Sequence, residues 1–311
     1  MTPASFNPTD VRFIKLGEKG KWEKSCIEDT QTIRLGFRSN QHNECLAGQW
    51  DQVRQYWLAE RNGSETEATK DIREIRAFYE LPRNTLWITF YNRLLYWCFA
   101  DEEVIELPQD KSRIRRVIGK WSCKSLSGTT LHVGNIDGRV SKVQGFRRTI
   151  CKVDRSDYLI RKIRGDEQPE VIATRKTFAD LTQHATDLIR GLWWHDFELL
   201  VDLIFSRSGW QRISVLGKTE KDVDIDMLSP VTNKRAFVQI KSSCDYDVFL
   251  ESLAVFQSNS VYDDMYFVAH TISDQRILDC SETGVSVIGP EKLAALTINA
   301  GLLDWLIKKH E

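Results

Sequence analysis

The first half of the chain repeatedly alternates apolar and polar residues with the two-residue period of a β-strand. Two longer windows carry apolar residues at helical spacing, and the second stops before Pro82, which favours a helix end there. Apolar runs on both sides of Asn92 and Arg93 predict a β-hairpin. The first half is therefore expected to be a strand-rich α+β domain. Its predicted strands are 11–16, 32–37, 85–91 and 94–100, with weaker candidates at 115–121, 138–143 and 147–153, and its predicted helices are 49–61 and 68–79.

Residues 154–170 are rich in charge and show no apolar period, which is typical of a linker. We place a domain boundary near residue 165, so that residues 1–165 and 166–311 form separate domains. A chain of 311 residues is also about the length that two domains need.

The second half changes to longer helices and short apolar strands. One of its helices has Phe197, Leu200 and Ile204 on a single apolar face, and Gly209 follows its end. The order of elements predicts an α/β fold around a mixed central sheet. The predicted helices are 178–190, 194–206, 248–257, 290–296 and 302–309, the strands are 211–215, 223–228, 236–241, 265–270 and 285–288, and a loop covers 217–221.

Overall charge does not indicate nucleic-acid binding, because 43 basic and 44 acidic side chains leave a net charge of −1. Affinity for phosphate would have to come from local clusters of Lys and Arg. The seven cysteines form no Cys-x-x-Cys motif, which argues against a disulfide framework or a zinc site and favours a cytoplasmic location. No signal-peptide pattern and no apolar run of about 18 residues is present, so we expect no membrane partner.

The predicted hairpin of the second half gathers polar side chains on one face. Asp222, Asp224 and Asp226 share a face of the first strand, because strand side chains alternate. Gln239 and Lys241 share a face of the second strand in the same way. A turn centred near residue 232 places Gln239 opposite about residue 225 and Lys241 opposite about residue 223. We therefore expect the carboxylates, the amide and the ammonium to converge on one patch.

Such a patch suits phosphodiester hydrolysis with Mg²⁺, which takes oxygen ligands and keeps several waters; Mn²⁺ is expected to substitute. An aspartate is the strong ligand, and the Gln239 side chain and the Ile240 backbone offer carbonyl oxygens. Lys241 would orient the attacking water or stabilise charge on the phosphate, and Glu198 on the preceding helix would reach the metal directly or through water. The alternative interpretation is an exposed hairpin face held by salt bridges.

The order of these residues resembles the Mrr-like branch of the PD-(D/E)xK nucleases over roughly residues 178–310. The matching features are a Phe-Glu pair at Glu198, Gly209 closing that helix, an aspartate opening the second strand, and Gln239-x-Lys241 on the third. The resemblance implies a Mg²⁺-dependent endonuclease with Glu198, an aspartate, Gln239 and Lys241 in its active site.

The aspartate position can be filled by Asp224 or by Asp226. We favour Asp224, because a strand of natural length then follows it. Asp226 lies nearer the turn and is a candidate second metal ligand.

The first domain resembles the helix-then-hairpin core of PUA-like domains, a superfamily that includes EVE-type and SRA-type readers of modified bases. The resemblance implies that a base is flipped into an aromatic-lined pocket. Core packing is the expected role of most of the ten tryptophans. The candidate pocket residues are Trp22, Trp50, Trp87, Tyr91 and Trp97, and the candidate phosphate contacts in two basic clusters are Arg115, Arg116, Arg147 and Arg148, with a solvated basic face as the alternative.

We therefore expect a Mg²⁺-dependent endonuclease of double-stranded DNA that acts in restriction and is directed by an N-terminal reader of modified or unmodified bases. One alternative is a nucleic-acid-binding or sensing protein with an inactive nuclease fold, and another is a nuclease that cuts RNA. Cleavage of both strands needs two active sites or two successive events, which is compatible with a homodimer.

Overall fold

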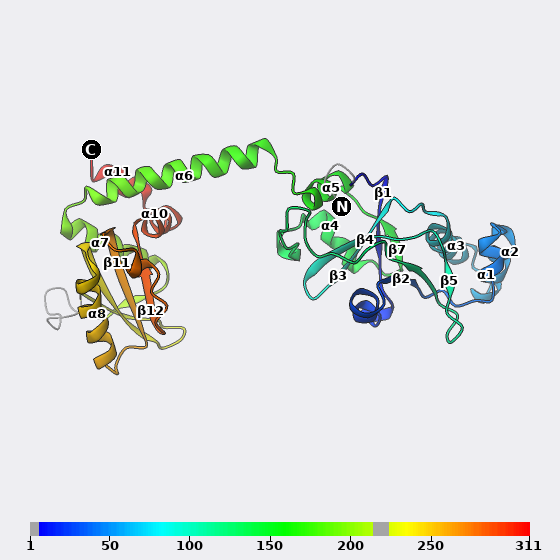
Figure 1. Ribbon diagram of the computed structural model, residues 1–311, viewed down its shortest axis with the longest axis horizontal. Helices are drawn as coiled ribbons and strands as arrows, with labels where there is room; N and C mark the ends of the chain where they lie inside the picture. The colour runs from blue at the N-terminus through cyan, green and yellow to red at the C-terminus, as the bar shows by residue number, and fades with distance from the viewer. Residues whose placement is uncertain (1–5, 214–223) are drawn as a thin grey trace. The chain divides into compact units, whose positions relative to one another are not determined.

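The computed structural model describes residues 6–213 and 224–311. Its contacts divide the chain into two compact units, Met1–Gln168 and Pro169–Glu311, which we call the N-terminal and C-terminal units. In Figure 1 the first is coloured blue to green and the second green to red. The sequence places the boundary at residue 165, and the contacts place it at residue 168.

The larger sheet of the N-terminal unit has the strand order β4-β3-β1-β7 within residues 6–168. Asn92 and Arg93 have positive φ angles, as a tight two-residue turn requires, so the predicted hairpin of β3 and β4 is confirmed. Apolar clusters cover both faces of this sheet, which explains why β3 is buried almost throughout. The strands are β1 (Asp10–Ile14), β3 (Thr85–Tyr91), β4 (Leu94–Phe99) and β7 (Ile150–Lys152).

A smaller antiparallel sheet in the same unit has the order β2-β6-β5. Three helices pack Val53, Trp57 and Phe78 against it and against one face of the larger sheet. These elements are β2 (Thr32–Leu35), β5 (Ile105–Glu106), β6 (Arg113–Arg116), α1 (His42–Leu46), α2 (Trp50–Glu60) and α3 (Glu65–Glu80). The short helical segments of the unit are η2 (Glu18–Gly20), η3 (Ser25–Asp29), η4 (Val133–Asn135), α4 (Gly138–Ser141), η5 (Lys142–Gly145) and α5 (Ser156–Arg164).

Two predictions for the N-terminal unit are wrong. The weak strand expected at 138–143 is helical, because the Asp137 side chain accepts a hydrogen bond from the backbone of Arg139 and caps α4. The expected linker 154–170 contains α5, which buries Leu159 and Ile163. These two apolar residues are a helical turn apart, and the charges around them obscure the pattern.

The C-terminal unit is built on one mixed sheet with the order β12-β11-β10-β9-β8 over its described residues. β10, β11 and β12 are parallel to one another, whereas β9 pairs antiparallel with both β10 and β8. The predicted mixed α/β architecture is therefore confirmed for this unit. The strands are β8 (Gln211–Arg212), β9 (Ile225–Leu228), β10 (Arg235–Cys244), β11 (Asp264–Ile272) and β12 (Val285–Ile288).

Helices cover both faces of this sheet (Figure 1). One face packs Val238 and Ile240 against Phe197 and Leu200 of α7, together with α6, α10 and α11. The other face packs Phe237 against α8 and α9. The helices are α6 (Pro169–Arg190), α7 (Trp194–Arg207), α8 (Tyr246–Ser258), α9 (Gln275–Leu278), α10 (Pro290–Asn299) and α11 (Leu303–Lys308).

Helix α6 begins nine residues before the predicted start at residue 178. Its first turns are exposed, so they carry no apolar face from which the helix could be recognised. The predicted loop 217–221 lies outside the described residues. None of the described helices is long and apolar enough to cross a membrane.

Candidate active site

The pairing of β9 with β10 decides which side chains meet. Val238 lies opposite Ile225, and Phe237 lies opposite Asp226, so the next residue, Gln239, faces the position of Asp224. The expected partner of Gln239 was about residue 225, one position away. The difference matters because a one-residue slip moves a side chain to the opposite face of the sheet. The observed register places Gln239 on the face of the aspartates.

Asp224 is held against β10 by two hydrogen bonds. Its Oδ2 accepts from Nε2 of Gln239 at 2.8 Å and from the backbone N of Ile240 at 2.6 Å. Gln239 is only 5% exposed, so its amide has little access to bulk water. The amide nitrogen of Gln239 faces the Asp224 carboxylate. The carboxylate and the amide therefore form one preorganised pair.

Glu198 lies near this pair although it belongs to α7. The helix buries Phe197 and Leu200 against the sheet. Glu198 lies between these two residues in the sequence, so their packing also fixes its position in space. Burial and the nearby charge of Asp224 raise the pKa of Glu198, whereas His195 lowers it less. The Nδ1 of His195 is 3.8 Å from Oε2 of Glu198. The negative charge of Asp224 therefore acts on Glu198, which belongs to a different element.

Lys241 follows Gln239 on the same face of β10 and is half-buried. Among the described residues, no carboxylate pairs with its ammonium within salt-bridge distance. Asp222, which shares the alternation of Asp224 and Asp226 in the sequence, lies outside the described residues. Lys241 is therefore a cation beside the Asp224–Gln239 pair.

Asp226 has a different environment from Asp224. Its Oδ2 accepts a hydrogen bond from Nη2 of Arg235 at 2.5 Å, and the Arg235 guanidinium lies 5.6 Å from the ring centroid of Tyr262. The Asp226 side chain is 15% exposed. Asp226 thus neutralises an arginine near the hairpin turn, whereas Asp224 contacts Gln239 and lies near Glu198.

The oxygen donors fit Mg²⁺ better than zinc. The side chains of Asp224 and Glu198 offer carboxylate oxygens and the Gln239 side chain and Ile240 backbone offer carbonyl oxygens, which are the donor types that Mg²⁺ prefers. No cluster of three or more His, Cys, Asp or Glu side chains suited to a metal occurs in residues 6–213 and 224–311. A zinc site would need such a cluster, whereas Mg²⁺ is commonly held by one or two carboxylates and its own waters.

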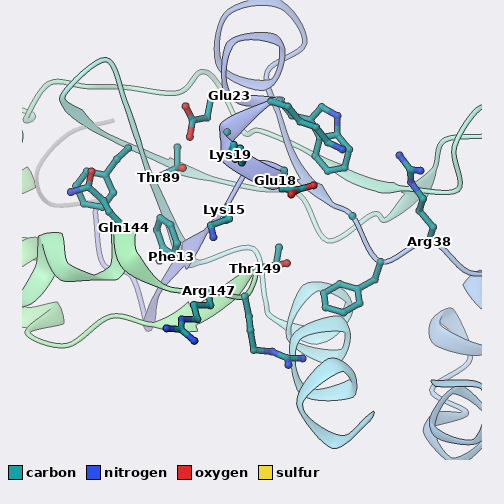
Figure 2. Close-up of a pocket in the computed structure, with 18 of the residues that line it drawn as sticks. Phe13, Lys15, Glu18, Lys19, Glu23, Arg38, Thr89, Gln144, Arg147 and Thr149 are labelled. Carbon is teal, nitrogen blue, oxygen red and sulfur yellow. The ribbon is translucent and has the colours of Figure 1, made fainter. Parts of the chain in front are cut away.

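The N-terminal unit contains a cavity of about 800 Å³, which we call the N-terminal cavity. Seven basic side chains and two glutamates line it, so its charge is positive. Figure 2 shows Lys15, Lys19 and Arg147 around the hollow. Its aromatic lining is Phe13, Trp22, Phe37, Trp57 and Phe90, and its basic lining is Lys15, Lys19, Lys21, Arg38, Arg61, Arg147 and Arg148.

The tryptophans proposed for a base pocket lie in different places. Trp22 lines the N-terminal cavity, with the Arg34 guanidinium 4.1 Å from its ring centroid. Trp87 is fully buried and Trp97 is 7% exposed, so both are core residues and neither can stack on a base. Trp50 is half-buried and donates a hydrogen bond to Glu80, which occupies its ring nitrogen.

Tyr91 is half-buried at the end of β3 and does not line the N-terminal cavity. The prediction misses most of the cavity lining because those residues come from separate segments. Gly17 and Gly20 have positive φ angles and mark the tight loop that carries Lys19 and Lys21. The two glycines of that loop are the feature of the sequence from which this part of the cavity lining could be predicted.

The arginines proposed as phosphate contacts also lie in different environments. Arg115 is fully buried and donates to the backbone carbonyls of Asp101, Phe78 and Ala100, so it cannot form part of a phosphate-binding surface. Its interior position results from β6 lying over the core. Arg116 is exposed on the same strand.

Arg147 is exposed and lines the N-terminal cavity. Arg148 also lines it but bonds three carboxylates of α3, namely Glu67, Asp71 and Glu74. Most of the charge of Arg148 is therefore neutralised by the protein itself.

Comparison of the sequence with known protein families finds no match, and comparison with curated proteins finds no significant match. Two solved structures resemble the chain distantly. The DNA modification-dependent restriction endonuclease AspBHI has 12% identity and a TM-score of 0.33, with 96% of this chain and 84% of that chain covered. The MspJI restriction endonuclease in complex with a 27-mer oligonucleotide has 14% identity and a TM-score of 0.24, with 90% and 74% covered.

Proposed function

We propose that the C-terminal unit is a Mg²⁺-dependent endonuclease of the PD-(D/E)xK type. The observation that carries this proposal is the hydrogen-bonded pair of Asp224 and Gln239 beside Glu198, with Lys241 next on the same strand face. Two neighbouring carboxylates repel each other, and a divalent ion bound between them would relieve that repulsion.

In this function Asp224 and Glu198 would hold the cation, with the carbonyls of Gln239 and Ile240 as neutral donors. The bound cation would neutralise the phosphate and lower the pKa of a coordinated water. Gln239 fixes the orientation of the Asp224 carboxylate through its 2.8 Å hydrogen bond. The Lys241 ammonium would stabilise negative charge that develops on the phosphate and orient the attacking water. Asp226, bonded to Arg235, contributes to the hairpin rather than to the metal site.

The N-terminal unit is proposed to direct the nuclease by binding DNA, modified or unmodified, at the N-terminal cavity. A cavity of about 800 Å³ with basic and aromatic lining is large enough for a nucleotide. Arg147 and Lys15, which line it, would contact phosphate, while the aromatic side chains offer apolar surface for a base.

The proposal is tested by incubating the whole chain with Mg²⁺ and plasmid DNA that is unmodified, methylated or hydroxymethylated, with RNA in parallel. We expect DNA cleavage that Lys241→Ala and chelation of the metal both abolish. Full activity of Lys241→Ala would contradict the assigned site, and cleavage of RNA alone would move the substrate to RNA. Tight DNA binding without cleavage under any of these conditions would favour a sensing protein with an inactive nuclease fold.

A further inference from the structure

Three aromatic rings lie together on the surface where α7 begins. Trp193 is 62% exposed and Trp194 is 50% exposed, and His195 is exposed beside them. The His195 ring centroid is 3.3 Å from that of Trp194 and 4.4 Å from that of Trp193. We call Trp193, Trp194 and His195 the ring cluster.

The exposure of these two indoles is unusual within the C-terminal unit. Trp210 and Trp305, its other tryptophans, are half-buried and pack against the apolar core. Trp193 and Trp194 instead expose half or more of their surface, although an indole gains more from burial than almost any other side chain. Exposed aromatic surface of this kind marks an interaction site more often than a structural one.

The ring cluster adjoins the proposed nuclease site. Trp194 and His195 precede Glu198 by four and three residues, so the three side chains share one face of α7. Helical side chains lean toward the N-terminus, which directs the Glu198 carboxylate toward the turn that carries the rings. The 3.8 Å distance between His195 Nδ1 and Glu198 Oε2 agrees with this direction.

We propose that the ring cluster stacks on a nucleobase of the substrate strand next to the phosphate that is cleaved. The inference rests on the proposed nuclease function, because it takes the cleaved phosphate to lie at Glu198 and Asp224. A base is joined to its phosphate through a single sugar, and the rings lie only about one helical turn, roughly 5.4 Å, from Glu198 along α7. The face of a base is apolar and π-rich, and it matches an exposed indole without regard to sequence.

This placement also defines the form of the substrate. A base inside a duplex is covered on both faces by its neighbours, so an indole can stack only on a base that is unpaired, terminal or displaced. The C-terminal unit is therefore assigned a DNA substrate with an unpaired base beside the cleaved bond, at a strand end, at a flap or after local opening of the duplex.

Photochemical cross-linking tests the inference directly on the whole chain. A DNA duplex carries one 5-iodouracil, either in a single-stranded overhang or in the centre of the paired region, and is irradiated with the protein in Ca²⁺. Trypsin cuts after Arg190 and Arg207, so the ring cluster falls in one peptide, residues 191–207. We expect the overhang probe to form its adduct on this peptide and the paired probe not to do so.

Two variants make the readout specific. Replacing both indoles, Trp193→Ala with Trp194→Ala, should remove the adduct and weaken binding of the overhang DNA by roughly 5- to 100-fold. The matched control is Phe178→Ala, an aromatic residue of α6 that is 45% exposed, and it should leave the adduct and the affinity unchanged. Circular dichroism of each variant checks that it is folded.

The possible outcomes separate the inference from the nuclease function. Adducts only on other peptides, or an adduct that survives the double substitution, would overturn the stacking role. Equal adducts from both probes would overturn the requirement for an unpaired base. A double variant that changes from dimer to monomer in sedimentation while keeping its adduct would assign the rings to self-association instead. An adduct on residues 191–207 in a protein that cleaves no substrate would overturn the nuclease function but not the binding surface.

Discussion

At the scale of single residues, Asp224 and Asp226 lie two positions apart in the sequence but have different partners. Asp224 accepts hydrogen bonds from Gln239 and from the Ile240 backbone, and its charge raises the pKa of Glu198. Asp226 bonds Arg235 instead. The sequence left these two candidates open because both lie on one strand face, and only the partners across the sheet distinguish them.

Substitution of each aspartate tests this distinction. Asp224→Asn should lower the cleavage rate by more than about 100-fold, because it removes a charge from the proposed metal site. Asp226→Asn should keep most of the activity and lower the unfolding midpoint, because it weakens the bond to Arg235. Single-turnover cleavage and thermal unfolding of both variants measure the two effects. The reverse ranking of activity would reassign the metal ligand to Asp226.

Gln239 allows a test of the metal that does not depend on activity. Gln239→Glu replaces the amide that bonds Asp224 with a second buried carboxylate, so the metal-free protein should be less stable than the wild type. Binding of Mg²⁺ should offset this repulsion, so that Mg²⁺ raises the unfolding temperature more in the variant than in the wild type. Thermal unfolding with and without Mg²⁺ measures the difference.

The control for that experiment is Gln239→Leu, which removes the same hydrogen bond without adding charge. The Gln239→Leu variant should unfold at a lower temperature than the wild type, and Mg²⁺ should not restore its unfolding temperature. If Gln239→Glu and Gln239→Leu responded alike to Mg²⁺, the cation would not bind beside Asp224.

At the scale of elements, one arginine joins α3 to the strand β7. Arg148 bonds Glu67, Asp71 and Glu74, and the last two side chains are almost fully buried. Glu74 also accepts hydrogen bonds from the backbone N–H groups of Thr149 and Ile150 at 2.8 and 3.1 Å. The network holds the wall of the N-terminal cavity that Arg148 lines.

Removing this arginine should therefore destabilise the N-terminal unit. Arg148→Ala leaves buried Glu74 without its cation and leaves buried Asp71 with Arg61 alone, and breaking a buried ion pair costs about 3 kcal/mol. Arg147→Ala is the control, because Arg147 is exposed and its loss should shift the free energy of unfolding little. Urea unfolding of both variants measures the costs, and equal losses would show that the network contributes no stability.

Two helices that the sequence missed in whole or in part share one property. α5 buries only Leu159 and Ile163 and carries charged residues around them, whereas the first turns of α6 bury nothing. Periodicity detects a helix through its apolar face, so a short or exposed helix gives a weak signal. The hairpin of β3 and β4 and the helix α7 have strong apolar patterns, and their predicted bounds are close to those observed.

At the scale of the whole molecule, the chain forms two units that are joined at Gly165–Gln168. α5 ends at Gly165, which adopts a left-handed conformation, and α6 begins at Pro169. Residues 165–168 are exposed and belong to no helix or strand. Exposed connecting segments of this kind are the usual sites of proteolytic cleavage.

Limited proteolysis should therefore cut first within this connection. A protease specific for acidic residues should cleave at Asp166 or Glu167 and release two fragments of about 19 kDa and about 17 kDa, since both residues are exposed and belong to no helix or strand. Each fragment should unfold cooperatively, because each unit has its own apolar core. Early cuts elsewhere, or fragments that do not remain folded, would argue against two independent units.

The sequence by itself determined the features that depend on neighbouring residues: the strands and helices with a strong apolar period, the mixed sheet of the C-terminal unit, and the candidate site residues. Only the tertiary structure decided the register that pairs Gln239 with Asp224, the burial of Arg115, and the N-terminal cavity formed by distant segments. The reason is physical. Alternation and helical spacing are local, whereas register and cavity shape arise from packing between residues far apart in the chain, and a single-residue slip in that packing moves a side chain to the other face of the sheet.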